Sequence, residues 1–257
     1  MIVKEVTDIL EELAPLNYAE GFDNVGLLVG NQNSEVTGIL VTLDTLENVV
    51  DEAIETKCNL IVSFHPIIFK GLKKITGNNY VERVVIKAIQ HDIAIYSMHT
   101  ALDNSANGVN AKICDVLGLQ NRSMLIPQEN TIKKLTTYIP KTQAEKLKNS
   151  LFNAGAGSIG NYSNCSFTSE GIGTFKANEA ANPTIGEVGK RHSENEAQIQ
   201  VTYQKSKEAG ILNALFENHP YEEVAYEIYT LENVNQDIGM GMVGSLTNSL
   251  SELEFLN

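Results

Sequence analysis

The chain has 257 residues, of which 42% are hydrophobic and 20% charged, and its formal net charge is −13 at pH 7. These proportions are normal for a globular protein of one large or two ordinary domains. The negative charge argues against nucleic-acid polymers and anionic membrane surfaces as partners, because both are bound mainly through Lys and Arg. No stretch is apolar for long enough to span a bilayer. Three scattered cysteines, Cys58, Cys114 and Cys165, indicate reduced thiols and a cytoplasmic protein.

The first half of the chain alternates between strand and helix patterns. An amphipathic helix over residues 6–14 ends at Pro15, and a turn then leads into a short strand before Gly30. Such alternation over residues 38–118 predicts an α/β domain with a mostly parallel sheet. The predicted strands there are 38–44, 60–63 and 93–98. The first predicted helix is capped by Asp44 or Thr45 and runs to about Thr56, and the second begins after Asn79 as its cap. The third covers 108–117 and ends before Gly118.

The pattern changes near residue 125. We expect a polar joint over 125–130 and a long turn over 177–196. The order β-α-β-β-α-β after the joint, with this turn between the second and third strands, predicts an inserted ferredoxin-like α+β domain. Its strands are expected at 134–139, 165–169, 198–203 and 226–229, and its helices at 142–153 and 205–218.

These patterns divide the chain into an α/β domain of residues 1–127 and 233–257 and an inserted domain of residues 128–232. Residues 239–246 return to a strand pattern, for which we expect no partner strand. Residues 247–257 look like the beginning of a helix. An unpaired apolar strand edge would favour association.

Polar residues follow two of the apolar strands at the points where they end. His65 follows the strand that begins at Leu60, and His99 and Asp103 follow the strand of 93–98. Ligands in open parallel sheets bind outside the carboxyl ends of strands, so these side chains should converge at one edge. Imidazole and carboxylate are usual ligands of zinc, iron and manganese. The alternative is structural: each histidine bonds to a backbone carbonyl and Asp103 opens a turn.

Two other motifs give weaker evidence of a functional site. Gly155–Gly160 matches the dinucleotide fingerprint, but a helix precedes it and a strand-like segment follows, so a turn is the preferred interpretation. His219, with Tyr221, Glu222 and Glu223 after it, stands at the end of a predicted helix that Pro220 terminates. A structural role is favoured there, and a binding role at the domain edge is the alternative.

Four segments together resemble one family. They are Gly21–Leu27, Ser63–Leu72, His99–Asp103 and His219–Tyr229. In these segments the chain resembles the Nif-three-like dinuclear-metal-centre family, whose members are named GTP cyclohydrolase 1 type 2 homologues. The resemblance implies a toroidal homohexamer with two divalent ions per subunit. It also implies that residues 128–232 are the PII/CutA-like inserted domain of the longer members.

The family's metal ligands carry over in part. Its paired histidines fall on Phe64 and His65, and its His-Thr-x-Leu-Asp motif is intact in His99 and Asp103. A further His and Glu near the family's C-terminus have no counterpart before Asn257, so the chain is expected to lack the family's C-terminal part. The resemblance therefore implies metal ligands His65, His99 and Asp103, and we expect one ion at most.

The resemblance implies a divalent-metal-binding protein whose nucleotide substrate would be GTP. The bound ion would lower the pKa of a water molecule that attacks the purine ring. The alternative is a non-catalytic, ring-forming scaffold or regulatory binding protein with a vestigial metal site. Whether the chain is an enzyme is left open by the sequence.

Overall fold

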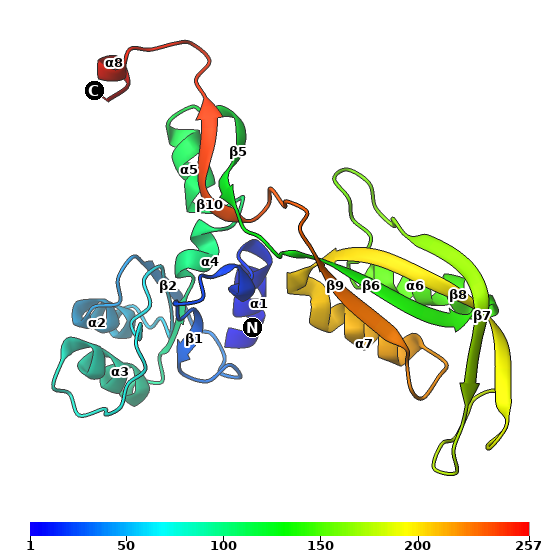
Figure 1. Ribbon diagram of the computed structural model, residues 1–257. Coiled ribbons are helices and arrows are strands. Elements are labelled where there is room, and N and C mark those ends of the chain that lie inside the picture. Colours follow the sequence, from blue (N-terminus) through cyan, green and yellow to red (C-terminus); the bar gives the residue numbers. More distant parts are fainter. Residues whose placement is uncertain (257) are drawn as a thin grey trace. The chain divides into compact units, whose positions relative to one another are not determined.

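The computed structural model describes residues 1–256 and divides into two compact units. Unit 1 consists of Met1–Pro127 and the residues from Gln236 onward, and unit 2 is Gln128–Asn235. The return to unit 1 thus lies slightly later than the predicted boundary after residue 232. Within residues 1–256, no helix has both the length and the apolar character that crossing a membrane requires. The protein is a mixed α/β structure with several sheets (Figure 1).

The first sheet of unit 1 has four strands in the order β1-β4-β3-β2. Strands β2, β3 and β4 are parallel, and β1 joins the β4 edge in the antiparallel direction. The sheet is therefore mostly parallel, as the alternation of strands and helices predicted. Its strands are β1 (Gly26–Val29), β2 (Ile39–Thr42), β3 (Leu60–Ser63) and β4 (Ala94–Ser97).

Helices cover both faces of this sheet. Side chains of successive strand residues point to opposite faces, so Ile61 and Ile95 are buried in one apolar cluster and Leu60 and Tyr96 in another. The first cluster includes residues of α2 and α3, and the second includes residues of α1. Full burial on both faces explains why β3 and β4 are continuous apolar runs. The helices are α1 (Val3–Leu13), α2 (Glu47–Glu55) and α3 (Tyr80–Gln90).

One of the predicted helix caps is confirmed and the other is wrong. The Asn79 side chain accepts a hydrogen bond of 2.9 Å from the backbone N–H of Glu82, which caps α3 as expected. Helix α2 instead begins after Leu46, whose side chain makes no cap hydrogen bond. Asp44 and Thr45 lie too early in the chain to cap it, and Asp44 binds a histidine.

Unit 1 also contains a two-stranded antiparallel ribbon. Strand β10 pairs with β5 from Gly239 opposite Pro127 to Ser245 opposite Gln120. The predicted polar joint at 125–130 is therefore wrong in its first part, because residues up to Pro127 continue β5. The expectation that residues 239–246 lack a partner is also wrong. Together with three helices, the two strands complete unit 1. The elements are α4 (His99–Asp103), α5 (Val109–Val116), β5 (Gln120–Pro127), β10 (Gly239–Ser245) and α8 (Glu252–Leu256).

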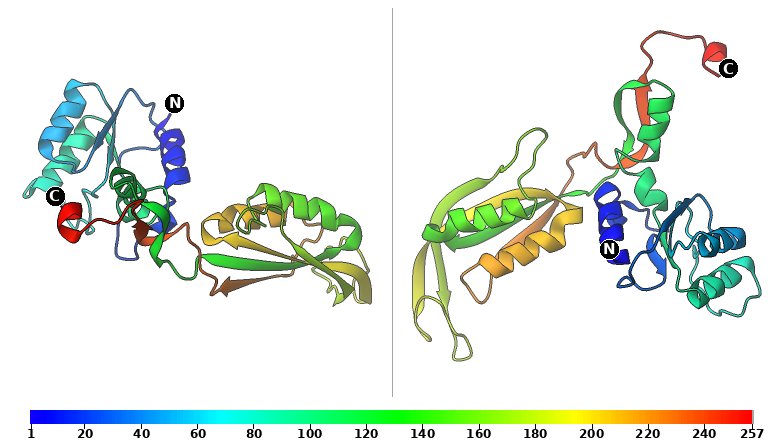
Figure 2. Two further views of the ribbon diagram at one scale, coloured as in Figure 1. Left: turned by 90° about the horizontal axis from the view of Figure 1, so that it is seen from above. Right: turned by 180° about the vertical axis from the view of Figure 1, so that it is seen from behind.

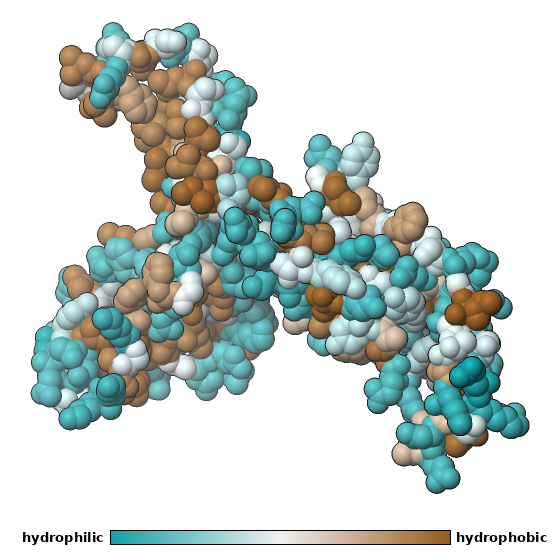
Figure 3. Space-filling view, viewed as in Figure 1, coloured by the Kyte–Doolittle hydropathy of each residue, from teal (hydrophilic) through white to brown (hydrophobic). Residues whose placement is uncertain are grey.

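The ribbon and α5 carry exposed apolar side chains. Figure 3 shows apolar surface over β5, β10 and α5. Two-stranded ribbons leave much of their surface open, because one layer cannot cover both faces. The large exposed side chains there are Val116 (78%), Leu125 (60%), Ile126 (55%), Ile113 (50%), Val243 (49%) and Met240 (48%).

Unit 2 is a four-stranded antiparallel sheet with two helices, in the element order β-α-β-β-α-β. The strand order is β7-β8-β6-β9. Figure 2 shows α6 and α7 on the same face of the sheet, and the buried apolar residues of unit 2 lie between these two layers. The elements are β6 (Ile132–Pro140), α6 (Ala144–Asn153), β7 (Phe167–Lys176), β8 (Arg191–Gln204), α7 (Glu208–Asn218) and β9 (Tyr226–Leu231). Short 3₁₀ turns occupy Leu16–Tyr18, Lys141–Gln143 and Lys205–Lys207.

The hairpin of β7 and β8 is longer than the sequence predicted. The long turn expected over 177–196 ends at Lys190, since Arg191 already pairs with Lys176. Strand pairing thus extends into a polar segment in which exposed and half-buried side chains alternate. The glycine-rich segment after α6 is a turn, with positive φ at Gly155 and Gly157, as the preferred interpretation held.

Candidate functional site

His65 and His99 lie together at the carboxyl ends of two neighbouring parallel strands. Ser63 and Ser97, the last residues of β3 and β4, are paired in register. The chain leaves both strands at the same edge, and the two imidazole rings lie with their centroids 5.6 Å apart at 74°. The predicted convergence of these two histidines therefore follows from the parallel register of the sheet.

Asp23 orients the His99 ring. The Nδ1 atom of His99 lies 2.8 and 2.9 Å from the two carboxylate oxygens of Asp23, whose side chain is fully buried. The same carboxylate accepts hydrogen bonds from the Thr100 hydroxyl, the Thr100 N–H and the Asn24 N–H. Burial raises the pKa of Asp23, but these hydrogen bonds outweigh it and lower the pKa below its usual value. Asp23 is therefore a carboxylate that holds the imidazole in one orientation.

His99 begins α4 with an unusual backbone conformation. Its φ is +24°, a region that residues with a side chain rarely adopt. The hydrogen bonds of Asp23 to both His99 and Thr100 fix the first turn of the helix around this residue. Backbone strain of this kind is typical of functional sites.

A second aspartate makes the equivalent contact with His65. The Nδ1 atom of His65 lies 2.7 Å from Oδ1 of Asp44, and both side chains are about half exposed. Asp44 follows β2, the strand next to β3. Both histidines thus have Nδ1 bound to a carboxylate, which leaves the Nε2 atom of each ring for another partner.

Asp103 lies close to the two histidines. It is the last residue of α4, one turn after His99, and the predicted turn follows it at Asn104. Burial raises the pKa of Asp103, Asp23 raises it further, and His99 and His65 lower it. The three sequence-predicted residues therefore lie within electrostatic reach of one another.

Aromatic rings surround the histidine pair. Phe64 lies 5.1 Å from the His65 ring and 5.5 Å from the His99 ring, measured between centroids, and Phe69 lies 6.3 Å from His99. Phe22 in turn lies 6.4 Å from Phe69 and is 68% exposed. Phe64 supplies no lone pair, so this wall of the site is apolar where the family resemblance places a second histidine.

The arrangement fits a divalent ion in part. Histidines that bind metals usually direct their other ring nitrogen to a carboxylate, as His65 and His99 do here. However, among residues 1–256 no group of three or more His, Cys, Asp or Glu side chains is arranged so that it could hold a metal ion. The described residues supply two oriented imidazoles and a nearby carboxylate, without a preformed three-ligand set.

The sequence did not reveal the two orienting aspartates. Asp23 lies in Gly21–Leu27, one of the segments that carry the family resemblance, but nothing in its spacing connects it with His99. Asp44 was predicted to end the strand of 38–44 and was one of two candidates to cap the next helix, and the strand order that places it beside His65 comes from the structure. The histidine–carboxylate contacts themselves are long-range and required the fold.

His219 has a structural role. Its Nε2 donates to the backbone carbonyl of Tyr138 at 2.9 Å, and its Nδ1 accepts from the N–H of Tyr221 at 3.2 Å. Burial lowers the pKa of His219, so the ring is neutral at pH 7. A neutral ring interacts little with the dipole of α7, and the predicted dipole contact is replaced by two backbone hydrogen bonds.

Comparison with known proteins gives consistent matches over nearly the whole chain. The family model Duf34/NIF3 (NGG1p interacting factor 3) matches residues 1–257. A Bacillus subtilis protein named GTP cyclohydrolase 1 type 2 homolog is 42% identical over 253 residues, which cover 98% of this chain and 68% of the relative. A relative of the same name from Halalkalibacterium halodurans is 39% identical over 97% of this chain and 68% of its own length.

Solved structures agree with these sequence matches. The crystal structure of a Bacillus cereus protein related to NIF3 superposes with a TM-score of 0.82 at 37% identity, covering 99% of this chain and 68% of that one. A Staphylococcus aureus protein superposes with a TM-score of 0.69 at 31% identity, covering 99% of this chain and 66% of that one. Both the fold and the sequence are thus shared over almost all of this chain.

Proposed function

Because the chain belongs to the Duf34/NIF3 family, we propose that it binds a divalent metal ion through His65 and His99, with Asp103 as the third ligand. The observation that carries the proposal is the pair of adjacent imidazoles, each with Nδ1 bound to an aspartate. Such a carboxylate makes an imidazole a better ligand and fixes its tautomer. Zinc, iron and manganese all accept this combination of donors.

The reaction we propose is hydrolytic opening of the purine ring of GTP, as the names of the relatives suggest. A bound divalent ion supplies an activated water molecule at neutral pH. On the protein side, Asp23 and Asp44 orient the two imidazoles. Phe64 and Phe69 form an apolar wall beside the imidazoles.

A second candidate is a non-catalytic scaffold or regulatory binding protein. It is favoured by the lack of a three-ligand group among residues 1–256 and by Phe64 at the position of a family histidine. In this proposal unit 2 is the inserted PII/CutA-like domain, supported by its β-α-β-β-α-β order and its antiparallel sheet. Self-assembly into the homohexamer and a cytoplasmic location, consistent with three free cysteines, belong to both candidates.

Metal binding is tested by dialysing the purified chain against Zn²⁺ or Mn²⁺ and measuring the retained metal by elemental analysis. We expect about one ion per chain at most, because a tightly held ion needs three or four protein ligands. His65→Asn and His99→Asn should each abolish retention, and His192→Asn, which changes a histidine of unit 2, should not. Equal retention in all variants, or two tightly held ions in the wild type, would contradict the assignment.

The same variants separate the two candidate functions. Turnover of GTP with added Mn²⁺ that disappears in His65→Asn and His99→Asn supports the hydrolase. Metal retention without turnover supports the scaffold, whereas a hexamer in light scattering is expected for both candidates.

A further inference from the structure

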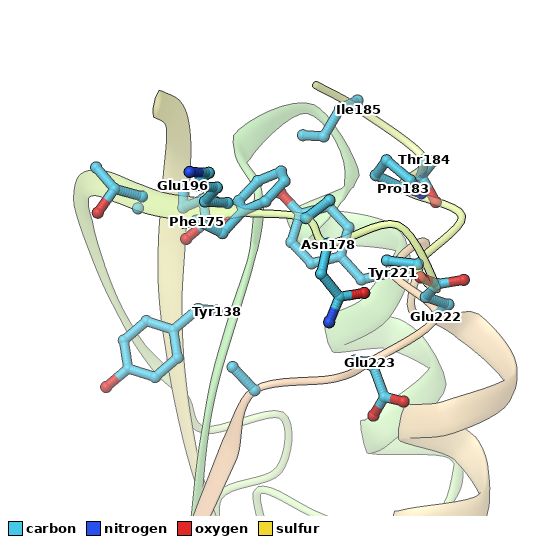
Figure 4. Close-up of a pocket in the computed structure, with 16 residues that line it drawn as sticks. Tyr138, Phe175, Asn178, Pro183, Thr184, Ile185, Glu196, Tyr221, Glu222 and Glu223 are labelled. Atoms are coloured by element: carbon cyan, nitrogen blue, oxygen red, sulfur yellow. The ribbon is translucent and has the colours of Figure 1, made fainter. Parts of the chain in front are cut away.

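Unit 2 contains a pocket of about 500 Å³ that the proposed metal site does not use. This volume is in the range of small-molecule sites. The walls come from β6 to β8, from the loop 177–190 that joins β7 to β8, and from the turn between α7 and β9. Figure 4 shows Pro183, Thr184 and Ile185 of the loop above Glu222 and Glu223 of the turn.

The loop is held in place without a ligand. The backbone N–H of Asn182 donates to a Glu222 carboxylate oxygen at 2.8 Å, and the Thr184 hydroxyl donates to the Pro220 carbonyl at 2.7 Å. At the base of the loop, the Gly189 N–H donates to the Ala177 carbonyl at 2.9 Å. The pocket is therefore preformed, which lowers the entropic cost of binding.

Aromatic rings form the middle of the pocket. The rings of Phe175 and Tyr221 lie 6.1 Å apart at 58°, and both line the cavity. Tyr221 is held by its hydroxyl, which donates to Glu196 at 2.8 Å. Electron-rich faces of aromatic rings attract organic cations.

Carboxylates stand on two sides of these rings. Glu196 lies on one side, and Glu222 and Glu223 lie on the other (Figure 4). Lys176 is the one cationic side chain among the residues that line the pocket, so the lining is acidic on balance. The backbone of Gly173 lies so close to Glu196 that a Cβ there would collide with the carboxylate. Glu196 is thus packed into its position.

From this arrangement we infer that the pocket of unit 2 binds a small organic cation, an aliphatic chain with an ammonium group at each end. The ammonium groups pair with Glu196 at one end and with Glu223 at the other. The aliphatic chain between them lies against Phe175 and Tyr221. An inorganic cation satisfies the charges but not the apolar rings, and an anionic nucleotide is repelled by the three carboxylates.

The test is calorimetric titration of the full chain with spermidine, which has an ammonium group at each end and a third within its chain, with MgCl₂ as a second arm. Glu223→Gln removes one charge from the pocket, and Glu223 makes no hydrogen bond among the described residues that would be lost with it. Glu217→Gln on α7 removes the same charge outside the pocket. We expect Glu223→Gln to weaken spermidine binding by about 3- to 10-fold, and Glu217→Gln to change it by less than about 1.5-fold.

Phe175→Leu is a variant that leaves the charge of the pocket unchanged. It should weaken spermidine binding by about 2- to 5-fold without changing Mg²⁺ binding. Circular dichroism of each variant verifies that unit 2 is folded. Three results would overturn the inference: no spermidine binding up to about 10 mM, equal weakening by Glu223→Gln and Glu217→Gln, or Mg²⁺ binding that competes at equal concentration. Because His65 and His99 are unchanged in these variants, failure here leaves the metal proposal standing.

Discussion

Replacing Asp23 by Asn removes the carboxylate that organises the start of α4. One carboxylate oxygen accepts from the Asn24 N–H at 2.7 Å, and the other accepts from the Thr100 N–H at 3.1 Å. A carboxamide has only one oxygen. In Asp23→Asn, one of these backbone N–H groups must therefore face an NH₂ group, whichever way the amide is turned.

The cost follows from that lost acceptor. An unsatisfied N–H at a buried position costs about 1–3 kcal/mol, and the Asp23 side chain is fully buried. That range corresponds to roughly a 5- to 150-fold increase in local opening. The His99 imidazole also loses its carboxylate partner, which typically lowers metal affinity about 10- to 100-fold.

Hydrogen exchange measured by mass spectrometry on the full chain reports this change locally. We expect faster exchange in peptides covering β4 and α4, while unit 2 keeps its protection. Asp8→Asn is the matched control, because Asp8 is 56% exposed and pairs with Lys4 on the surface of α1. Asp8→Asn should change the free energy of local opening, derived from the exchange rates, by less than about 0.5 kcal/mol. If Asp23→Asn and Asp8→Asn gave the same exchange, Asp23 would not be the organising residue.

Three further predictions concern stability. Hydrogen bonds from Thr76, first among them its N–H, lower the pKa of Glu82 to about 2, so its stabilisation of α3 should be complete above about pH 4.5 and be lost as the pH falls towards 2. Urea titrations of Glu82→Gln, which should lack this pH dependence, test it. Leu147→Ala opens a cavity in the core of unit 2 and should cost about 2–5 kcal/mol, measured by urea unfolding against the exposed Leu253→Ala. Burial lowers the pKa of His219, so unit 2 should lose stability as the pH falls below about 6.5, a loss that His219→Gln should reduce.

The local patterns of the sequence predicted most of the fold of unit 1. Three features depend only on neighbouring residues and were found where expected. They are the apolar runs of β3 and β4, the cap at Asn79 and the helix that ends before Gly118. Residues 239–246 show the limit of this approach. Their strand pattern was recognised, but pairing with β5 joins segments more than a hundred residues apart, and no local signal specifies such a partner.

The candidate site was predictable to the same degree. Strand-end positions placed His65 and His99 at one sheet edge, since parallel register carries both strands to the same side. The contacts of Asp23 and Asp44 with the two rings depend on loop conformations and on the unusual φ of His99. Side-chain pairing of that kind is set by tertiary structure, which periodicity does not describe.

The ribbon of β5 and β10 has a consequence for how the chain folds. Pro127 and Gly239 are paired residues in unit 1, yet the chain between them forms all of unit 2. Closing a loop on the order of 100 flexible residues is entropically costly and slows the formation of such a pair. In unit 2, however, Ile132 pairs with Leu231, so folding of unit 2 brings the two ends of the insertion together. Once unit 2 has folded, the segments 128–131 and 232–238 are what remains to be closed when the ribbon forms, so the effective loop is much shorter than the insertion.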